Sequence, residues 1–111
     1  MPIIRANTSI VTQINVFTVP TPDRQQPLID FLTEAAKVSS EVPGWLSASL
    51  HRSLDGTRVV NYAQSSDPDA ARRVIEHLRT RGLLEANKSF GTAHPGLYEV
   101  AWTLDRDVGS R

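Results

Sequence analysis

The spacing of hydrophobic and polar positions changes along the chain, and each change predicts a new element of secondary structure. Residues 10–19 mix β-branched and polar side chains, a composition that favours a strand. From Gln25 the apolar residues recur at helical intervals, and Pro43-Gly44 ends the pattern. Pro27 fits the first turn of this helix, where a missing N–H removes no intrahelical hydrogen bond. The pattern therefore predicts a strand followed by a helix.

Two strand-like runs, 45–54 and 57–65, flank Asp55-Gly56, a dipeptide suited to a two-residue type I′ turn. Counting outward from this turn assigns each side chain to a face of the hairpin. The more apolar face carries Leu46, Ala48, Leu50, Arg52, Val59, Asn61, Ala63 and Ser65. The other face carries Trp45, Ser47, Ser49, His51, Ser53, Arg58, Val60, Tyr62 and Gln64. We assign the first face to the helices and the second, with its amphipathic residues, to a dimer contact.

A second helix is expected from Asp67, which suits an N-cap, and Pro68, which suits the first helical position. Gly82 ends or kinks this helix. After a proline–glycine turn, residues 97–104 alternate in the manner of a strand. The chain thus has a second helix and a fourth strand.

The resulting order, β-α-β-β-α-β, predicts an α+β fold of the ferredoxin-like kind. In that fold an antiparallel sheet carries both helices on one face. We expect a single domain over residues 1–111, with an ordered core of about 9–104 and a frayed polar tail over 105–111.

Composition narrows the range of partners. Twelve basic and twelve acidic side chains cancel, and no basic stripe is present, so nucleic acid and a membrane surface are not expected as partners. The absence of cysteine excludes disulfides, thiolate nucleophiles and iron–sulfur sites. No stretch resembles a signal peptide or approaches the ~20 apolar residues of a membrane span. We expect a cytoplasmic protein, and a chain this small gains burial by dimerising.

The segments 42–51 (VPGWLSASLH) and 55–64 (DGTRVVNYAQ) resemble the antibiotic biosynthesis monooxygenase family. They are especially similar to the small enzymes that oxidise anthrone-type intermediates in aromatic polyketide pathways. The resemblance implies a homodimeric α+β barrel, in which two four-stranded sheets pack face to face. It also implies a substrate pocket between sheet and helices in each monomer, and no metal or organic cofactor.

Asn61 and His51 are the candidate catalytic residues that the resemblance supports. A carboxamide on the helix-facing side of a central strand needs partners. These are either a substrate oxygen, whose charge the amide stabilises, or the backbone or a buried water. Imidazole suits proton transfer near neutral pH, but the register puts His51 on the opposite face, where a dimer contact is its alternative role.

The expected substrate-binding positions lie around the same pocket and are Ser65, Leu50, Ala71, Leu84, Arg79 and Asn15. Ser65, Ala71 and Leu84 stand where the similar polyketide enzymes carry tryptophan, tyrosine and arginine. Asn15 stands where haem-degrading relatives carry an asparagine on the first strand. Arg79 can reach over the pocket mouth and hold an anionic substrate, or it is an ordinary charge of a helix surface.

The resemblance implies a cofactor-independent monooxygenase that uses dioxygen to oxidise a planar phenolic or anthrone-like molecule to a quinone. Two alternatives stay open. The small residues at positions 65 and 71 also suit a non-catalytic dimeric binder, or an accessory protein for a hydrophobic metabolite. A cyclase or isomerase in the same fold is the other. The sequence has no serine-hydrolase elbow, no phosphate-binding loop and no metal-ligand spacing.

Overall fold

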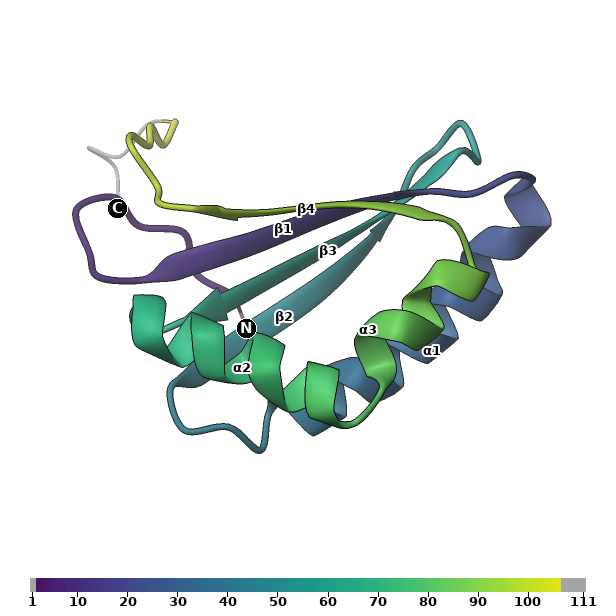
Figure 1. Cartoon of the computed structure of the whole chain (residues 1–111). Coiled ribbons are helices and arrows are strands. Elements are labelled where there is room, and N and C mark those ends of the chain that lie inside the picture. Colours follow the sequence, from purple (N-terminus) through teal and green to yellow (C-terminus); the bar gives the residue numbers. More distant parts are fainter. Residues whose placement is uncertain (1, 107–111) are drawn as a thin grey trace.

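Four antiparallel strands form one sheet in the order β2-β3-β1-β4, and α1, α2 and α3 lie on one face of it (Figure 1). This computed structural model describes residues 2–106. The main elements are β1 (Val11–Thr18), α1 (Gln25–Ser39), β2 (Trp45–Arg52), β3 (Arg58–Ser65), α2 (Pro68–Thr80), α3 (Leu83–Ala86) and β4 (Thr92–Tyr98). Short 3₁₀ turns, η1 (Pro22–Arg24) and η2 (Asn87–Ser89), precede α1 and β4. The predicted α+β, ferredoxin-like fold is confirmed.

The hydrophobic core lies between α1 and the centre of the sheet. Leu28 and Leu32 of α1 pack against Phe17 of β1 and Val59 of β3, together with Val19. Burial of each such side chain stabilises the fold by about 1.5–3 kcal/mol. Residues at helical spacing on α1 and residues at strand alternation on the sheet therefore pack into one core cluster.

The second helix begins where the sequence predicts. The side chain of Asp67 accepts a hydrogen bond from the N–H of Ala70 (2.8 Å), and Pro68 is the first helical residue. Gly82 follows the helix with φ 75°, in the left-handed region that glycine adopts without strain. The chain then turns into α3 and η2, and Phe90 anchors this segment on Phe31 of α1, with ring centroids 5.0 Å apart.

The register of the β2–β3 hairpin is the predicted one. Leu50 lies opposite Asn61, and Ala48 lies opposite Ala63. Asn61 and Ala63 face the helices, where they line a cavity with residues of α1 and α2. Since neighbouring side chains of a strand alternate, Tyr62 points to the other face, as expected.

The turn of this hairpin differs from the prediction. Gly56 has a positive φ (80°) and Asp55 does not, whereas a type I′ turn needs a positive φ at both central residues. The closing backbone hydrogen bond runs from Ser53 N–H to Arg58 O (3.0 Å). Inside this longer loop the Asp55 carboxylate accepts hydrogen bonds from the backbone N–H (3.0 Å) and the hydroxyl (2.6 Å) of Thr57. The two-residue turn was therefore a wrong prediction, although it gave the right register.

The first residues of β2 also depart from simple alternation. Ser47 lies opposite Gln64, but Trp45 lies opposite Ser65, so Leu46 is the extra residue of a β-bulge. The bulge turns Trp45 toward the helices, where it lines the cavity beside Asn61. Leu46 is 47% exposed and lies on the other face, beside Gln64. The assignment of Trp45 to the dimer face and of Leu46 to the helical face was wrong for this reason.

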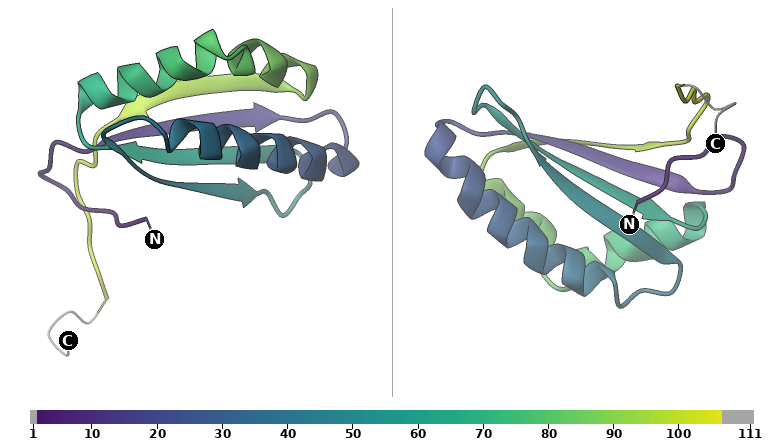
Figure 2. Two further views of the ribbon diagram at one scale, coloured as in Figure 1. Left: turned by 90° about the horizontal axis from the view of Figure 1, so that it is seen from below. Right: turned by 180° about the vertical axis from the view of Figure 1, so that it is seen from behind.

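The last strand lies earlier than predicted. β4 pairs with β1, with Pro95 opposite Asn15, whereas the alternating pattern predicts a strand over 97–104. A proline is tolerated there because β4 is an edge strand. Beyond β4 the chain leaves the sheet, and Trp102 is 74% exposed (Figure 2). Most of the predicted frayed tail, 105–111, lies outside the described residues.

The face of the sheet opposite the helices is uncovered at its centre (Figures 1 and 2). Alternation and register place four large side chains there, which we call the open face: Ile14, Val16, Val60 and Tyr62. At one end of this face the N-terminal segment crosses the sheet, where Gln64 Nε2 donates a hydrogen bond to Ile3 O (2.7 Å). Among residues 2–106, no helix has the length and apolar character that a membrane crossing requires.

Candidate active site

A small cavity of about 40 Å³ lies between the sheet and the helices, with room for a few water molecules. Its polar lining residues are Gln13, Asn15, Ser39, Trp45, Asn61 and Asn87. Its apolar lining residues are Phe17, Leu32, Ala35, Ala36, Ala48, Ala63, Val74, Leu78, Leu83 and Leu84. Within the described part of the chain, no charged side chain lines this inner cavity. It is therefore a neutral site with several hydrogen-bonding groups.

Two grooves adjoin the inner cavity. The outer groove, about 310 Å³, is lined by Gln13, Asn15, Ile75, Arg79, Leu84, Asn87, Lys88, Ala93 and Pro95. It shares four of these residues with the cavity: Gln13, Asn15, Leu84 and Asn87. A second groove, about 470 Å³, lies between α1 and β2 and shares Ala36, Trp45 and Ala48 with the cavity. Pockets for small molecules usually enclose ~300–1,000 Å³, so a ligand of that size must extend from the cavity into a groove.

Two carboxamides meet on the sheet side of the cavity. Asn15 of β1 and Asn61 of β3 are direct cross-strand partners, and both line the cavity. Asn15 is only 8% exposed, and its Oδ1 has no hydrogen-bond partner among the described residues. The Asn61 side chain makes no hydrogen bond to any described residue either. A buried amide left without partners costs roughly 1–3 kcal/mol, which applies to Asn15. Asn61 is half-buried and also has hydrogen-bonding capacity left for a ligand.

Trp45 and Asn87 add two more polar atoms of the same kind. The indole Nε1 of Trp45 and the Oδ1 of Asn87 are buried, and neither has a partner in the described part of the chain. Both residues line the inner cavity, Trp45 from β2 and Asn87 from η2. Buried polar atoms are nearly always paired in folded proteins. Their gathering around one cavity therefore indicates a binding site.

The predicted site residues divide into those that line these spaces and those that do not. Asn61, Asn15 and Leu84 line the inner cavity. Arg79 lines the outer groove and forms an ion pair with Glu76 on the same helix. Leu50 lines the groove between α1 and β2. Two further predicted residues, Ser65 and Ala71, are buried at 6% and 4% exposure but do not line the inner cavity.

His51 lies away from the cavity. Its ring is on the side of the sheet opposite Asn61, within hydrogen-bonding distance of Ser49 Oγ (2.9 Å) and edge-on to Tyr62, with ring centroids 6.4 Å apart. The bulge that turns Trp45 inward lies before Ser47 and leaves the alternation at residue 51 intact. The hairpin register predicted this face for His51, and a catalytic role beside Asn61 would require it on the other face.

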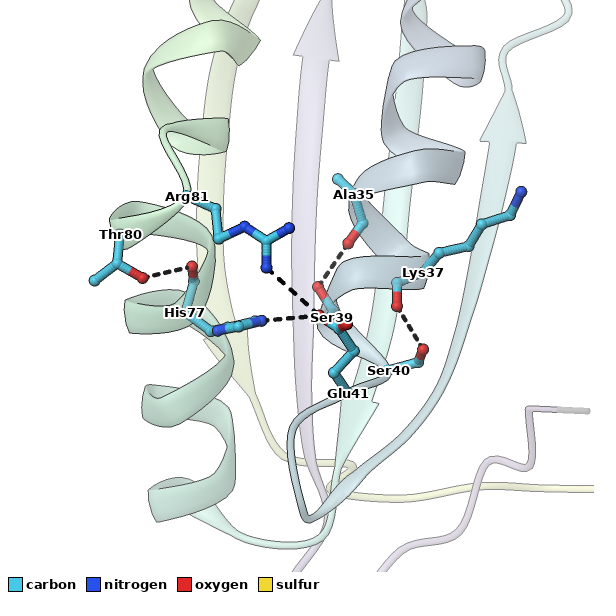
Figure 3. A network of polar contacts seen from close by, with 8 residues as sticks. All are labelled: Ala35, Lys37, Ser39, Ser40, Glu41, His77, Thr80 and Arg81. Atoms are coloured by element: carbon cyan, nitrogen blue, oxygen red, sulfur yellow. Dashed lines mark hydrogen bonds and ion pairs between the residues drawn. The ribbon is translucent and has the colours of Figure 1, made fainter.

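A polar network joins the ends of α1 and α2 beside the cavity (Figure 3). Glu41, just beyond α1, accepts from His77 Nε2 (3.1 Å) and lies 3.8 Å from Arg81 Nη1. Ser39, which lines the cavity, donates its hydroxyl to Ala35 O (3.0 Å). The network thus holds together the two helices that form the roof of the cavity.

Three residues that line the cavity were not among the predicted site residues: Trp45, Asn87 and Gln13. A regular hairpin count places Trp45 on the wrong face because a bulge leaves no mark in the pattern. Asn87 lies in a short 3₁₀ turn, and the one signal for it is that the haem-degrading relatives carry a helix histidine near this position. Gln13 is two residues before Asn15 on β1, so strand alternation from Asn15 is the signal that finds it.

The chemistry available in the cavity is hydrogen bonding without proton transfer. Carboxamides donate N–H groups that stabilise charge on a substrate oxygen. No side chain that takes up a proton near neutral pH lines the cavity within residues 2–106. In the same range, no three histidine or carboxylate side chains lie close enough to hold a metal ion together.

Comparison with known proteins identifies similar enzymes. Over 65 residues the chain is 40% identical to tetracenomycin F1 monooxygenase of Streptomyces glaucescens, a match that spans 58% of this chain and 57% of that protein. The monooxygenase ActVA-Orf6 of Streptomyces coelicolor, solved in complex with nanaomycin D, is 31% identical over 87% of this chain and 92% of its own, with a TM-score of 0.76. SnoaB, a cofactor-independent oxygenase of Streptomyces nogalater, is 27% identical over 87% of this chain and 98% of its own, with a TM-score of 0.75. No family model matches the chain.

Proposed function

Because the chain belongs to the antibiotic biosynthesis monooxygenase family, we propose that it is a cofactor-independent monooxygenase of planar aromatic substrates. The substrate class is a phenolic or anthrone-like molecule of the polyketide type, and the product is a quinone. The observation that carries this proposal is the neutral cavity around Asn15 and Asn61, whose carboxamides have no partners among the described residues.

The proposed reaction starts from the substrate anion. The anthrone loses a C–H proton to solvent, and the carbanion, delocalised onto the phenolate oxygen, passes one electron to dioxygen. Superoxide and the substrate radical then recombine, which forms a C–O bond at the former CH₂ carbon. The resulting peroxide anion takes up a proton from solvent. Loss of the remaining hydrogen of that carbon, with cleavage of the O–O bond, then releases water and leaves the quinone, so one oxygen atom enters the product and the other leaves as water.

The protein contributes binding, orientation and charge stabilisation. Asn61, and Asn15 opposite it, donate N–H groups to the oxygen on which negative charge develops. The apolar walls from α1 and α2 exclude water and hold the ring system flat against the sheet. Since the inner cavity encloses only about 40 Å³, the ring system extends into the outer groove, between β4 and the α3–η2 segment.

Oxygen uptake with dithranol in chelator-treated buffer tests the proposal. We expect uptake by the wild type, incorporation of one ¹⁸O atom from ¹⁸O₂, and a rate about 10²-fold lower for Asn61→Ala, the range typical of losing one such donor. Asn7→Gly is the matched control, because Asn7 is exposed and has a φ of 60° that glycine adopts freely. Equal rates for Asn61→Ala and the control contradict the role of Asn61. A product without ¹⁸O contradicts monooxygenation.

A series of anthrones with different acidities tests the absence of a protein base from the cavity. If the substrate ionises through its own acidity, the midpoint of the pH–rate profile moves with the pKa of each anthrone. A midpoint that stays at one pH for every substrate indicates a titrating protein group instead.

The second candidate is a binding protein for a hydrophobic metabolite. It is favoured by Ser65 and Ala71, which stand where the similar polyketide enzymes carry tryptophan and tyrosine and present no such group to the cavity. Saturable binding of hydroxylated anthraquinones without any oxygen uptake from anthrones supports this function. A cyclase or isomerase is less well supported, because such an enzyme needs an acid or base beside its substrate.

The partner that we propose is a second copy of the chain. The open face, Ile14, Val16, Val60 and Tyr62, is apolar at its centre, and no described helix covers it. Two such faces packed against each other would bury these side chains from both subunits. The single-copy sheet has no other large apolar face to contribute, since the helices occupy the reverse side.

A further inference from the structure

The indole of Trp45 reaches the cavity through an irregularity of the backbone. Without the bulge at Leu46, alternation from Ala48 would put Leu46 on the helical side and Trp45 on the open side. The bulge exchanges the two. As a result a leucine is 47% exposed, and a ring with a hydrogen-bond donor lies at the border of the inner cavity and the α1–β2 groove.

This exchange leaves one buried polar group without a partner in the described part of the chain. Leu46 has no polar atom and would be buried without cost, whereas the Nε1–H of Trp45 is buried and has no acceptor among the described residues. Buried tryptophans usually find a partner for this group. An arrangement that exposes the apolar residue and buries an unpaired donor is explained when a ligand supplies the acceptor.

Other unpaired atoms of the same cavity wall define what such a ligand looks like. Asn15 Oδ1 and Asn87 Oδ1 are the other buried, unpaired atoms of the cavity wall, and they belong to β1 and η2. A carboxamide offers a donor on one side and an acceptor on the other, and rotation about its last bond exchanges them. The indole offers only its N–H, so it alone requires an acceptor on the ligand.

We propose that Trp45 is a specificity-determining residue that donates its indole N–H to a carbonyl or phenolate oxygen of the bound aromatic molecule. Asn15 and Asn87 bind further hydroxyl or carbonyl groups of the same ligand. The site therefore selects aromatic molecules that carry oxygen on one edge over hydrocarbons of the same shape. This inference deepens the proposed function and rests on it for the identity of the substrate, whereas binding is measured independently of turnover.

The chain has two tryptophans, and this makes the test direct. In Trp102→Phe the single remaining indole is Trp45, so its emission reports on the cavity alone. The probe is 1,8-dihydroxyanthraquinone, which is already a quinone, and anthracene is the same ring system without oxygen. We expect the probe to quench the emission of Trp45 in Trp102→Phe in a saturable manner.

Calorimetric titration then compares Trp45→Phe with the matched control Trp102→Phe. Loss of one hydrogen bond weakens binding of the dihydroxyanthraquinone about 5- to 20-fold in Trp45→Phe and leaves it within about 2-fold in the control. The affinity for anthracene stays within about 2-fold in both variants. The ratio of the affinity for the dihydroxyanthraquinone to the affinity for anthracene decides the question. If the Trp45 ring only filled space, its replacement would affect both ligands equally.

Two results overturn the inference: equal affinity of both variants for the dihydroxyanthraquinone, or an equal loss of affinity for both ligands in Trp45→Phe. If Trp45→Phe does not fold, Trp102→Phe decides the question, because unchanged Trp45 emission at probe concentrations that raise the Tm excludes contact. Failure of the proposed function is distinguishable: dithranol would not be oxidised, while the binding ratio would still depend on Trp45.

Discussion

Asn15 and Asn61 lie directly opposite each other on β1 and β3, and both side chains face the helices. Cross-strand neighbours have Cβ atoms about 4.5–5.5 Å apart, so one ligand oxygen can lie within reach of both amides. Most pairs on the buried face of a sheet are apolar, as Phe17 and Val59 are two positions further along the same strands. Two carboxamides in this place lower the stability of the fold, and a role in binding explains why they are there.

Replacing Asn15 by leucine, which has a similar volume, should therefore stabilise the protein. The change removes a buried polar atom without a partner, and we expect the free energy of unfolding to rise by about 1–3 kcal/mol in urea titrations. Oxygen uptake and ligand affinity should fall in the same variant. A loss of stability would show instead that Asn15 has an intramolecular role.

The two glycines that flank the site differ in what a side chain would meet. Gly82 has φ 75° with nothing within 4 Å of an added Cβ, whereas at Gly44, with φ 93°, that atom would lie 2.6 Å from Ala70 Cβ. Gly82→Ala should cost about 1–2 kcal/mol, the penalty of the left-handed conformation alone. Gly44→Ala adds an overpacking cost of about 1–3 kcal/mol. Urea unfolding of both variants measures the two losses of stability, and the loss in Gly44→Ala should be the larger. Similar losses in the two variants would contradict this prediction.

Stability at acid pH should report on the hairpin loop. The Thr57 hydroxyl, followed by the Thr57 backbone N–H and the Ser53 hydroxyl, lowers the pKa of Asp55 to about 2. A lowered pKa means that the ionised carboxylate stabilises the folded state above pH ~4, and that this contribution is lost as the pH falls toward 2. Asp55→Asn should thus lower the Tm at pH 7, and the difference from the wild type should close near pH 2. In Thr57→Val the loss should begin at a higher pH.

The network around Glu41 should contribute little to the free energy of unfolding, and this contribution should depend on salt. Glu41→Gln removes the charge that His77 and Arg81 share, and exposed ion pairs are worth about 0–1 kcal/mol. We expect a loss of stability of that size at low salt that shrinks in 1 M NaCl. Glu34→Gln is the control, because its pair with Lys37 lies within α1 and joins no two elements. A large loss at both salt concentrations would mean that Glu41 acts by more than its charge.

Dimerisation should depend on the open face. Val60→Asp places a charge at the centre of that face, beside Val16, and burying it without a partner would be costly. We expect light scattering to give a dimer for the wild type and a monomer for this variant, and Thr33→Asp, exposed on α1, to remain dimeric. A wild type that is monomeric at micromolar concentration contradicts the proposed partner.

The sequence predicts the order of the elements and the centre of the sheet well, because these depend on alternation and helical spacing. Asp67 as the N-cap of α2 and the pairing of Leu50 with Asn61 follow from local rules, and both are confirmed. β4 was placed too late because Pro95 and the glycine after it look like a turn. Only the position of β4 at the sheet edge makes a proline acceptable there, and position in the sheet is not a local property.

The site is less predictable than the fold for a related reason. Asn61 and Asn15 are found by counting along regular strands, but Trp45 is not, because a single extra residue reverses the count. The pairing of His77 with Glu41 joins residues 36 positions apart and depends on how two helices pack. In each of these cases the missing information is long-range geometry.

The bulge in β2 divides the strand into two stretches. Which face the side chains of one stretch point to does not depend on the other stretch. Residues on the turn side of the bulge keep their orientation whether or not the extra residue is present. Deleting or inserting one amino acid at position 46 would therefore change which side chain before the bulge points toward the helices. Ala48 and Leu50 would keep their orientation. Variation in length at this one point, rather than replacement of residues, is thus a route by which the binding preference of such a protein can be altered while its scaffold stays the same.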